Sequence, residues 1–282
     1  MNHICDLHTH SVFSDGTLTP SEIAELADAK GLCAVALCDH NTVDGLPCFL
    51  NAAKGHNFEP IAGAEFSVDF DGTELHLLAL FIAPEHFQKI SEMMIDVNIR
   101  KEQSNIALCD SLIKAGFKLD YSSMKAKTPN GKINRAHFAA ELCRLGYARS
   151  ITEAFETLLS PESGHYKEPE RITVLDMITF IRSINAVPVL AHPFLELSYD
   201  ELSAFLPKAK QQGLIGMECE YPRFDDDETQ KAHSLAKQFG LLPSGGSDFH
   251  GANKPDIELG SGTGSLCVPL SWAEALKASA KA

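Results

Sequence analysis

Short apolar runs that end in polar residues recur along the first eighty residues of the chain. Four of them have the length and composition of buried strands: residues 3–7, 33–38, 58–64 and 75–82. A helical pattern, PSEIAELADAKG, lies between the first two, with Thr19 placed as its N-cap and Gly31 as its C-terminal stop. Strand, helix and strand joined by short connections predict parallel pairing through a right-handed crossover.

The pattern becomes helical after the fourth run. Apolar residues recur at helical spacing from Phe87 to Val97, and RAHFAAELCRLG and SITEAFETLLS have the pattern of two further helices. From residue 173 the alternation returns, with three helical patterns that each precede a strand: VPVLAHP, LIGMECEY and LLPSGGSDFHG. We therefore expect an α/β barrel domain built from residues 1–83 and 169–282, and a helical insertion, residues 84–168, that acts as a substrate lid.

Net charge narrows the classes of partner. The chain of 282 residues carries a formal charge of −14, which argues against a surface that is wholly a nucleic-acid platform. Residues 100–150 nevertheless contain ten Lys or Arg and four Asp or Glu, a balance of +6 that leaves −20 for the rest of the chain. This basic segment is expected either to meet an anion or to form solvated, Lys-rich helix faces.

Cysteine spacing and the termini indicate the compartment. The eight cysteines are scattered without CxxC pairs, which favours buried, reduced thiols over a disulfide framework or a zinc finger. No apolar run approaches the ~20 residues of a membrane helix, and the N-terminus lacks the pattern of a signal peptide. We expect a cytoplasmic protein with no membrane partner.

Candidate metal ligands follow several of the strand-like runs. A single buried histidine is usually a hydrogen-bonded core residue. Six histidines and three carboxylates are different, because burying so many without cations costs several kcal/mol per uncompensated ion. In parallel βα folds the carboxyl ends of the strands converge, so we expect one polynuclear site. Its predicted ligands are His8, His10, Asp15, His40, Glu65, His76, His192, Asp248 and His250.

The ligand types indicate which metals and which reaction to expect. Mixed imidazole and carboxylate ligands favour Mn²⁺, with Zn²⁺ or Fe²⁺ as alternatives, over Ca²⁺ or Mg²⁺. Nine ligands are enough for two or three divalent ions, with Glu65 a natural bridge. Such a site suits phosphoester hydrolysis, in which a metal-bridging hydroxide is the expected nucleophile. Glu65, Asp248 and His192 are the catalytic candidates.

Cationic residues near or within the insertion are candidates for substrate binding. A guanidinium can hold phosphate through two hydrogen bonds, which favours Arg135, and His137 could hydrogen-bond or protonate a leaving group. Lys132 and Arg171 are further candidates, and a structural role stays open for Arg135 and His137. A serine hydrolase or a nucleotide-binding loop has little support, because the chain contains neither GxSxG nor a Walker A sequence.

Six motifs resemble those of the PHP superfamily, named for polymerase and histidinol phosphatase. They are DLHTHSVFSDGTLTP, CDHNTVDG, GAEFS, ELHLL, VLAHP and GGSDFHGANKPDIELG, and the resemblance covers residues 1–83 and 169–265. It implies a distorted (β/α)7, TIM-like barrel with a trinuclear site. The implied ligand groups are His8, His10, Glu65 and Asp248 for one ion, Glu65, His76 and His192 for a second, and Asp15, His40 and His250 for a third.

The resemblance extends to one branch of that superfamily. Asp15, the insertion after His76 and the motif INRAHFA resemble small phosphoesterases that include 3′,5′-nucleoside bisphosphate phosphatases and 5′-3′ exonucleases acting on short RNA. Members of this branch often have Arg-Pro-His where this chain has Arg135-Ala136-His137. In the histidinol phosphatase branch, histidine is common at the position of Asp15 and the insertion is not expected.

These patterns lead to one principal hypothesis. We expect a phosphoesterase that removes a phosphate from a small nucleotide-like monoester, such as a 3′,5′-nucleoside bisphosphate. The alternatives are a 5′-3′ exoribonuclease acting on short RNA and a phosphatase similar to histidinol phosphatase. A noncatalytic metal-binding domain is a further alternative, weakened because no expected ligand is missing.

Overall fold

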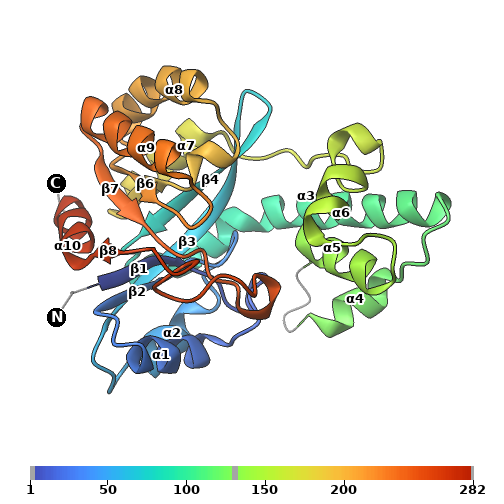
Figure 1. Cartoon of the computed structure of the whole chain (residues 1–282), viewed down its shortest axis with the longest axis horizontal. Helices are drawn as coiled ribbons and strands as arrows, with labels where there is room; N and C mark the ends of the chain where they lie inside the picture. Colours follow the sequence, from blue (N-terminus) through green and yellow to red (C-terminus); the bar gives the residue numbers. More distant parts are fainter. Residues whose placement is uncertain (1–3, 129–132, 281–282) are drawn as a thin grey trace.

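A mixed sheet of eight strands forms the centre of the computed structural model, which describes residues 4–128 and 133–280 (Figure 1). Its strand order is β7-β6-β5-β4-β3-β2-β1-β8. The strands are β1 (Ile4–Thr9), β2 (Ala34–Leu37), β3 (Glu59–Phe70), β4 (Thr73–Leu80), β5 (Val187–Leu190), β6 (Gly216–Glu220), β7 (Leu242–Gly245) and β8 (Val268–Pro269). The predicted α/β barrel class is confirmed. The described sheet has one strand more than expected because the two-residue β8 pairs antiparallel with β1.

Backbone hydrogen bonds draw the two sides of the sheet together. The Asp248 N–H donates to the His8 carbonyl oxygen at 2.8 Å, and the His10 N–H donates to the Phe249 carbonyl oxygen at 2.9 Å. These bonds join the end of β1 to the segment after β7, so the sheet curves into a nearly closed barrel. Residues from the two ends of the sequence therefore lie side by side.

Strand directions depart from a purely parallel barrel. Strands β1, β2 and β3 are parallel, and so are β5, β6 and β7, but β4 is antiparallel to both of its neighbours. Strands β3 and β4 form a hairpin whose turn, Asp71-Gly72, has φ values of 50° and 90°. Because β3 continues to Phe70, Glu65 lies inside a strand rather than at the strand end that its sequence predicted.

Helices cover the outside of the barrel (Figure 1). They are α1 (Pro20–Ala29), α2 (Leu46–Ala52), α7 (Val174–Ser183), α8 (Tyr199–Gln212), α9 (Asp226–Phe239) and α10 (Leu270–Ser279). The predicted start of α1 is confirmed, since the Thr19 side chain accepts from the Glu22 N–H and Glu22 accepts from the Thr19 N–H. The main core joins these helices to the sheet through buried side chains such as Ile23, Phe49 and Phe205.

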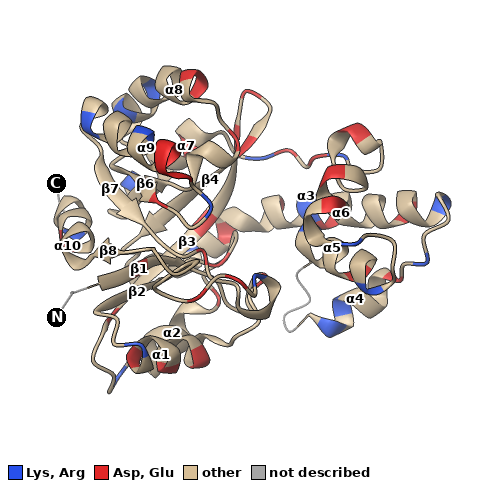
Figure 2. Cartoon of the chain, viewed as in Figure 1, with Lys and Arg blue, Asp and Glu red and all other residues tan. Residues whose placement is uncertain are grey.

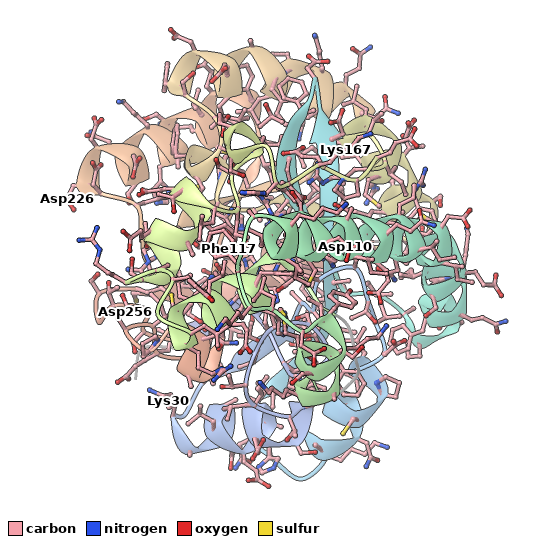
Figure 3. The ribbon with its side chains drawn as sticks, turned by 90° about the vertical axis from the view of Figure 1, so that its right-hand side faces the viewer. Lys30, Asp110, Phe117, Lys167, Asp226 and Asp256 are labelled. Carbon is pink, nitrogen blue, oxygen red and sulfur yellow. The ribbon has the colours of Figure 1, made fainter. Side chains whose placement is uncertain are left out.

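The predicted helical segment projects from one side of the barrel (Figure 1). It contains α3 (Phe87–Lys114), α4 (Tyr121–Lys127), α5 (Arg135–Arg144) and α6 (Ile151–Thr157). Figure 3 faces this part and labels Asp110 on α3 and Phe117 just beyond it. Helix α3 serves two cores, because Ile90 and Met94 pack with the barrel whereas Leu108 and Leu112 pack with α5. The boundaries at residues 84 and 168 stay a prediction.

Acidic residues offset much of the basic segment's charge, and both signs are interspersed over α3 to α6 (Figure 2). The ion pairs that involve its cations include Arg100 with Glu170, Lys125 with Glu102, Arg144 with Glu141, and Arg149 with Glu153. Most of these side chains are exposed, so each pair contributes at most about 1 kcal/mol. The alternative of solvated, charged helix faces therefore describes these four cations well.

The cysteines and the helices bear on the expected compartment. All eight cysteines are free, but Cys48 and Cys267 are exposed, so the expectation that the thiols are buried was wrong for these two. No helix in residues 4–128 or 133–280 is long and apolar enough to cross a membrane.

Candidate metal centre

The barrel brings all nine predicted ligands into one connected group. His8 and His10 come from the end of β1, and the bonds that close the barrel place them beside Asp248 and His250. His40 and His192 follow β2 and β5, whereas Glu65 and His76 face one another from β3 and β4. Asp15 lies in the loop between β1 and α1.

Glu65 is the centre of this group and is fully buried. Its Oε2 lies 3.3 Å from the Nε2 atoms of both His8 and His10, and 3.0 Å from His40 Nδ1. Its Oε1 lies 2.9 Å from His76 Nδ1 and 3.0 Å from His192 Nε2. The two carboxylate oxygens therefore face different histidines, as a bridging carboxylate requires.

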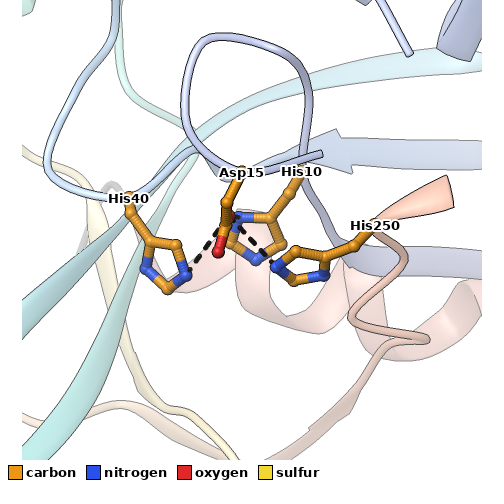
Figure 4. A group of neighbouring side chains, drawn as sticks. All are labelled: His10, Asp15, His40 and His250. Carbon is orange, nitrogen blue, oxygen red and sulfur yellow. Dashed lines mark ion pairs between the residues drawn. The ribbon is translucent and has the colours of Figure 1, made fainter. Parts of the chain in front are cut away.

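A second group of ligands surrounds Asp15 (Figure 4). Asp15 Oδ1 lies 3.1 Å from His250 Nε2 and 3.7 Å from His40 Nε2, and His10 completes the group. Two further sets of ligand atoms are compact enough for an ion: His8, His10 and Glu65, and His40, Glu65 and His76. These sets share His10, His40 and Glu65, so ions bound there would share ligands more extensively than the three implied groups do.

Unpaired polar atoms at the centre of the ligand group indicate whether metal cations fit this site. Seven buried side-chain atoms have no hydrogen-bond partner among the described residues: His8 Nε2, His10 Nε2, Asp15 Oδ1, Glu65 Oε2, His76 Nδ1, Arg100 Nε and Ser244 Oγ. Buried polar atoms are normally paired, because an unpaired one loses its interaction with water without compensation. Five of these seven atoms belong to the ligand group, and nitrogen with oxygen donors suits Mn²⁺, Fe²⁺ or Zn²⁺. The residues present therefore fit divalent transition-metal ions.

Electrostatics favour the charged form of the carboxylates. Burial by itself would raise the pKa of Glu65, but His76, His40 and His8 outweigh it and hold that pKa well below its usual range. The pKa of Asp15 is likewise lowered against the effect of burial, mainly by His250 and His40. Charged carboxylates are the form that binds cations.

Glu218 contacts two of the predicted ligands but is not among them. It is fully buried on β6, where its Oε1 accepts a hydrogen bond from His8 Nδ1 at 3.1 Å. Its Oε2 accepts from the backbone N–H of His192 at 2.8 Å. A carboxylate behind a histidine fixes which ring nitrogen faces the metal. A polar residue at the end of an apolar run was the sequence signal.

Asp248 is held by one carboxylate oxygen while the other faces the centre. Its Oδ2 accepts hydrogen bonds from Tyr221 at 2.9 Å and from Lys254 at 2.5 Å. Its Oδ1 lies 3.2 Å from His10 Nε2. The backbone is strained here, with φ of 52° at Asp248 and 25° at His192, values that residues other than glycine rarely adopt. The surrounding contacts therefore enforce the orientation of both side chains.

A cavity of about 190 Å³ adjoins the ligands, and Asp15, His40 and His76 are among the residues that line it. Arg135 and Arg171 also line the cavity, and each donates to Glu74 Oε2, at 2.9 and 2.6 Å. The Arg135 guanidinium also lies over the rings of Tyr166 and Phe155, 4.6 and 5.7 Å from their centroids. Both predicted arginines therefore reach the cavity, already paired with a carboxylate.

The other two residues predicted to bind substrate are His137 and Lys132. His137 does not line this cavity, and its Nδ1 accepts the Asn134 N–H in the capping box of α5. Lys132 lies outside the described residues. Sequence reasoning missed Lys101 and Asn134, which do line the cavity. Asn134 Nδ2 donates to Asp15 Oδ2 at 2.8 Å, so the insertion contacts the ligand group directly.

Comparison with known proteins gives consistent results. The PHP domain model matches residues 6–161. The 5′-3′ exoribonuclease of Haemophilus influenzae is 32% identical, over 87% of this chain and 89% of its own length. The 3′,5′-nucleoside bisphosphate phosphatase of Chromobacterium violaceum is 27% identical, over 95% of each chain. A solved structure from Chromobacterium violaceum, described as an amidohydrolase with bound sulfate and no metal, has a TM-score of 0.86 at 26% identity and covers 98% of this chain and 96% of its own.

Proposed function

This chain belongs to the PHP family of metal-dependent phosphoesterases, and from that premise we propose that it hydrolyses a phosphate monoester of a small nucleotide such as a 3′,5′-nucleoside bisphosphate. The observation that carries the proposal is a single cavity lined by both metal-ligand candidates and cations. A phosphate substrate needs both kinds of residue. The reacting phosphate must bind the metal ions, and cations must neutralise a neighbouring anionic group of the substrate. Sulfate in the Chromobacterium violaceum structure supports an anion site in a relative of similar fold.

Residues of the chain would have two roles in this reaction: some would bind the metal ions, and others would orient those ligands. Glu65 would bridge two ions, and the remaining eight ligand candidates would hold two or three, with Mn²⁺ expected first. When bound, such ions lower the pKa of water and neutralise charge on the attacked phosphate. Tyr221, Lys254 and Glu218 would keep Asp248, His8 and His192 oriented, so that little reorganisation is needed during the reaction.

A second candidate function is 5′-3′ trimming of short RNA, favoured by the exoribonuclease of Haemophilus influenzae, which is the more similar of the two relatives. The paired cations on α3 to α6 give it less support, because a strand-binding surface needs cations free to meet phosphates. We therefore place it second.

One assay separates these possibilities. Protein loaded with Mn²⁺ would be incubated with adenosine 3′,5′-bisphosphate, histidinol phosphate and a short 5′-phosphorylated RNA. We expect the highest kcat/KM for the bisphosphate, and Glu65→Gln should lower it at least about 1,000-fold because the bridging charge is lost. His86→Asn, a change outside the ligand group, is the control. Faster cleavage of RNA would favour the second function, and hydrolysis of none of the three would contradict both.

A further inference from the structure

Three cations line the wall of the cavity beyond the ligand candidates: Lys101, Arg135 and Arg171. Two of them already have a carboxylate partner, because Arg135 and Arg171 both donate to Glu74. Arg171 also donates to Glu168 at 2.8 Å. Glu74 thus acts as an internal anion that fixes the two guanidinium groups.

Lys101 differs from the two arginines. Among the described residues, its ammonium group forms neither a hydrogen bond nor an ion pair with a carboxylate within 4 Å. Burial lowers its pKa, attraction by Glu74 and Asp15 opposes this change, and repulsion by Arg135 and Arg171 adds to it. Lys101 is partly exposed and its charge faces the cavity without a carboxylate partner, so an anion that enters the cavity can bind it.

The backbone that carries Lys101 is held firmly. Val97 and Asn105 lie four residues before and after it on α3 and line the same cavity, so one face of the helix forms this wall. Asn105 Nδ2 donates to the Ile133 carbonyl oxygen at 2.7 Å, and Ser104 Oγ donates to the Lys167 carbonyl oxygen. These bonds tie α3 to the segments on either side of α5 and α6, so the position of Lys101 is set in advance of binding.

We propose that Lys101 is the specificity-determining cation that binds a second, nonreacting phosphate of the substrate. This inference rests on the proposed function, because the reacting phosphate must lie at Asp15, His40 and His76, which line the same cavity. A phosphate monoester carries about −1.5 to −2 charges near neutral pH, so one such group supplies the counterion that Lys101 lacks. Arg135 and Arg171, held by Glu74, would shape the pocket around it. The substrate class is therefore a compound with two phosphates.

The test compares esters with one and two phosphates. The kcat/KM of Mn²⁺-loaded wild type, Lys101→Met and Lys114→Met would be measured with adenosine 3′,5′-bisphosphate, both adenosine monophosphates and p-nitrophenyl phosphate. Lys114 is an exposed lysine on the same helix and is the matched control. Lys101→Met should lower kcat/KM for the bisphosphate about 10- to 100-fold, the effect of one charge-assisted hydrogen bond, and leave single-phosphate esters within about twofold. Lys101→Arg should recover part of the loss.

The possible results distinguish failure of the role proposed for Lys101 from failure of the proposed function. Equal losses on both classes of ester, or no loss on the bisphosphate, would overturn the assignment of Lys101. If wild type cleaves only the bisphosphate, a second phosphate is required, and Lys101→Met must then reduce that cleavage for the assignment to stand. Failure of wild type to cleave any of the phosphate esters would instead refute the proposed function. Circular dichroism of each variant shows whether a loss comes from misfolding.

Discussion

Glu218 shows how much of the candidate centre depends on residues that do not face the metals. One oxygen accepts from the His8 ring and the other from the His192 backbone, so a single buried carboxylate orients ligands from β1 and from the segment after β5. Its neighbour Glu220 also pairs with a histidine, His233, but that pair is partly exposed and lies outside the ligand group.

These two glutamates provide a matched prediction. Glu218→Gln should weaken Mn²⁺ binding about 10- to 100-fold, because an uncharged amide supports the His8 ring less well. Glu220→Gln should leave metal affinity within about twofold. Isothermal titration of metal-depleted protein with Mn²⁺ measures both, and similar affinities for the two variants would contradict the role given to Glu218.

The sequence predicted the nine residues that the fold brings together, but few of the residues around them. Histidines and carboxylates near apolar runs are visible without a structure, and all nine predicted ligands come together. Lys101 has no such signal, because its importance depends on which face of α3 lines the cavity. Asn134 precedes a predicted helix, but its contact with Asp15 joins residues 119 positions apart.

Helix α5 links the insertion to the candidate metal centre through its first residues. Asn134 accepts the His137 N–H as the N-cap and also donates to Asp15, whereas Arg135 in the first turn donates to Glu74. Element types were predicted well here, since both helical patterns after residue 132 form helices. The β3–β4 hairpin was predicted less well, because the predicted strands, residues 58–64 and 75–82, stop short of the Asp71-Gly72 turn. In the structure, β3 and β4 continue through polar residues up to this turn.

The N-cap of α5 can be tested against that of α6. Asn134→Ala and Ser150→Ala each remove a side-chain cap and should each lower the free energy of unfolding by about 1 kcal/mol. Only Asn134→Ala removes a hydrogen bond to Asp15, so it alone should reduce affinity for Mn²⁺. Urea unfolding and metal titration distinguish the two effects. Equal metal affinity in both variants would show that the contact with Asp15 has no role in metal binding.

In the whole molecule, two parts meet at the cavity. The barrel supplies the ligand candidates and the helical part supplies Lys101 and Arg135, while α3 packs into both hydrophobic cores. The sequence pattern distinguished the barrel from the helical segment, because their periodicities differ. It could not place them relative to one another, because side chains far apart in the sequence make that contact.

Metal binding should stabilise the molecule as a whole. Ions that satisfy the unpaired atoms of His8, His10, Asp15, Glu65 and His76 bind the folded chain in preference to the unfolded one. At a free Mn²⁺ concentration about 100 times the Kd, this linkage contributes about 2.7 kcal/mol, enough to raise Tm by roughly 5 °C or more. Thermal unfolding with EDTA, Mn²⁺ or Ca²⁺ tests this expectation. Equal Tm values with EDTA and Mn²⁺ would count against a metal site.

The most direct test of the central claim is the release of inorganic phosphate from adenosine 3′,5′-bisphosphate by the Mn²⁺-loaded protein. We predict steady turnover that EDTA abolishes, that added Mn²⁺ restores and that Glu65→Gln reduces at least about 1,000-fold. Phosphate release that is unaffected by EDTA and by Glu65→Gln, or no release from the metal-loaded wild type, would contradict the account.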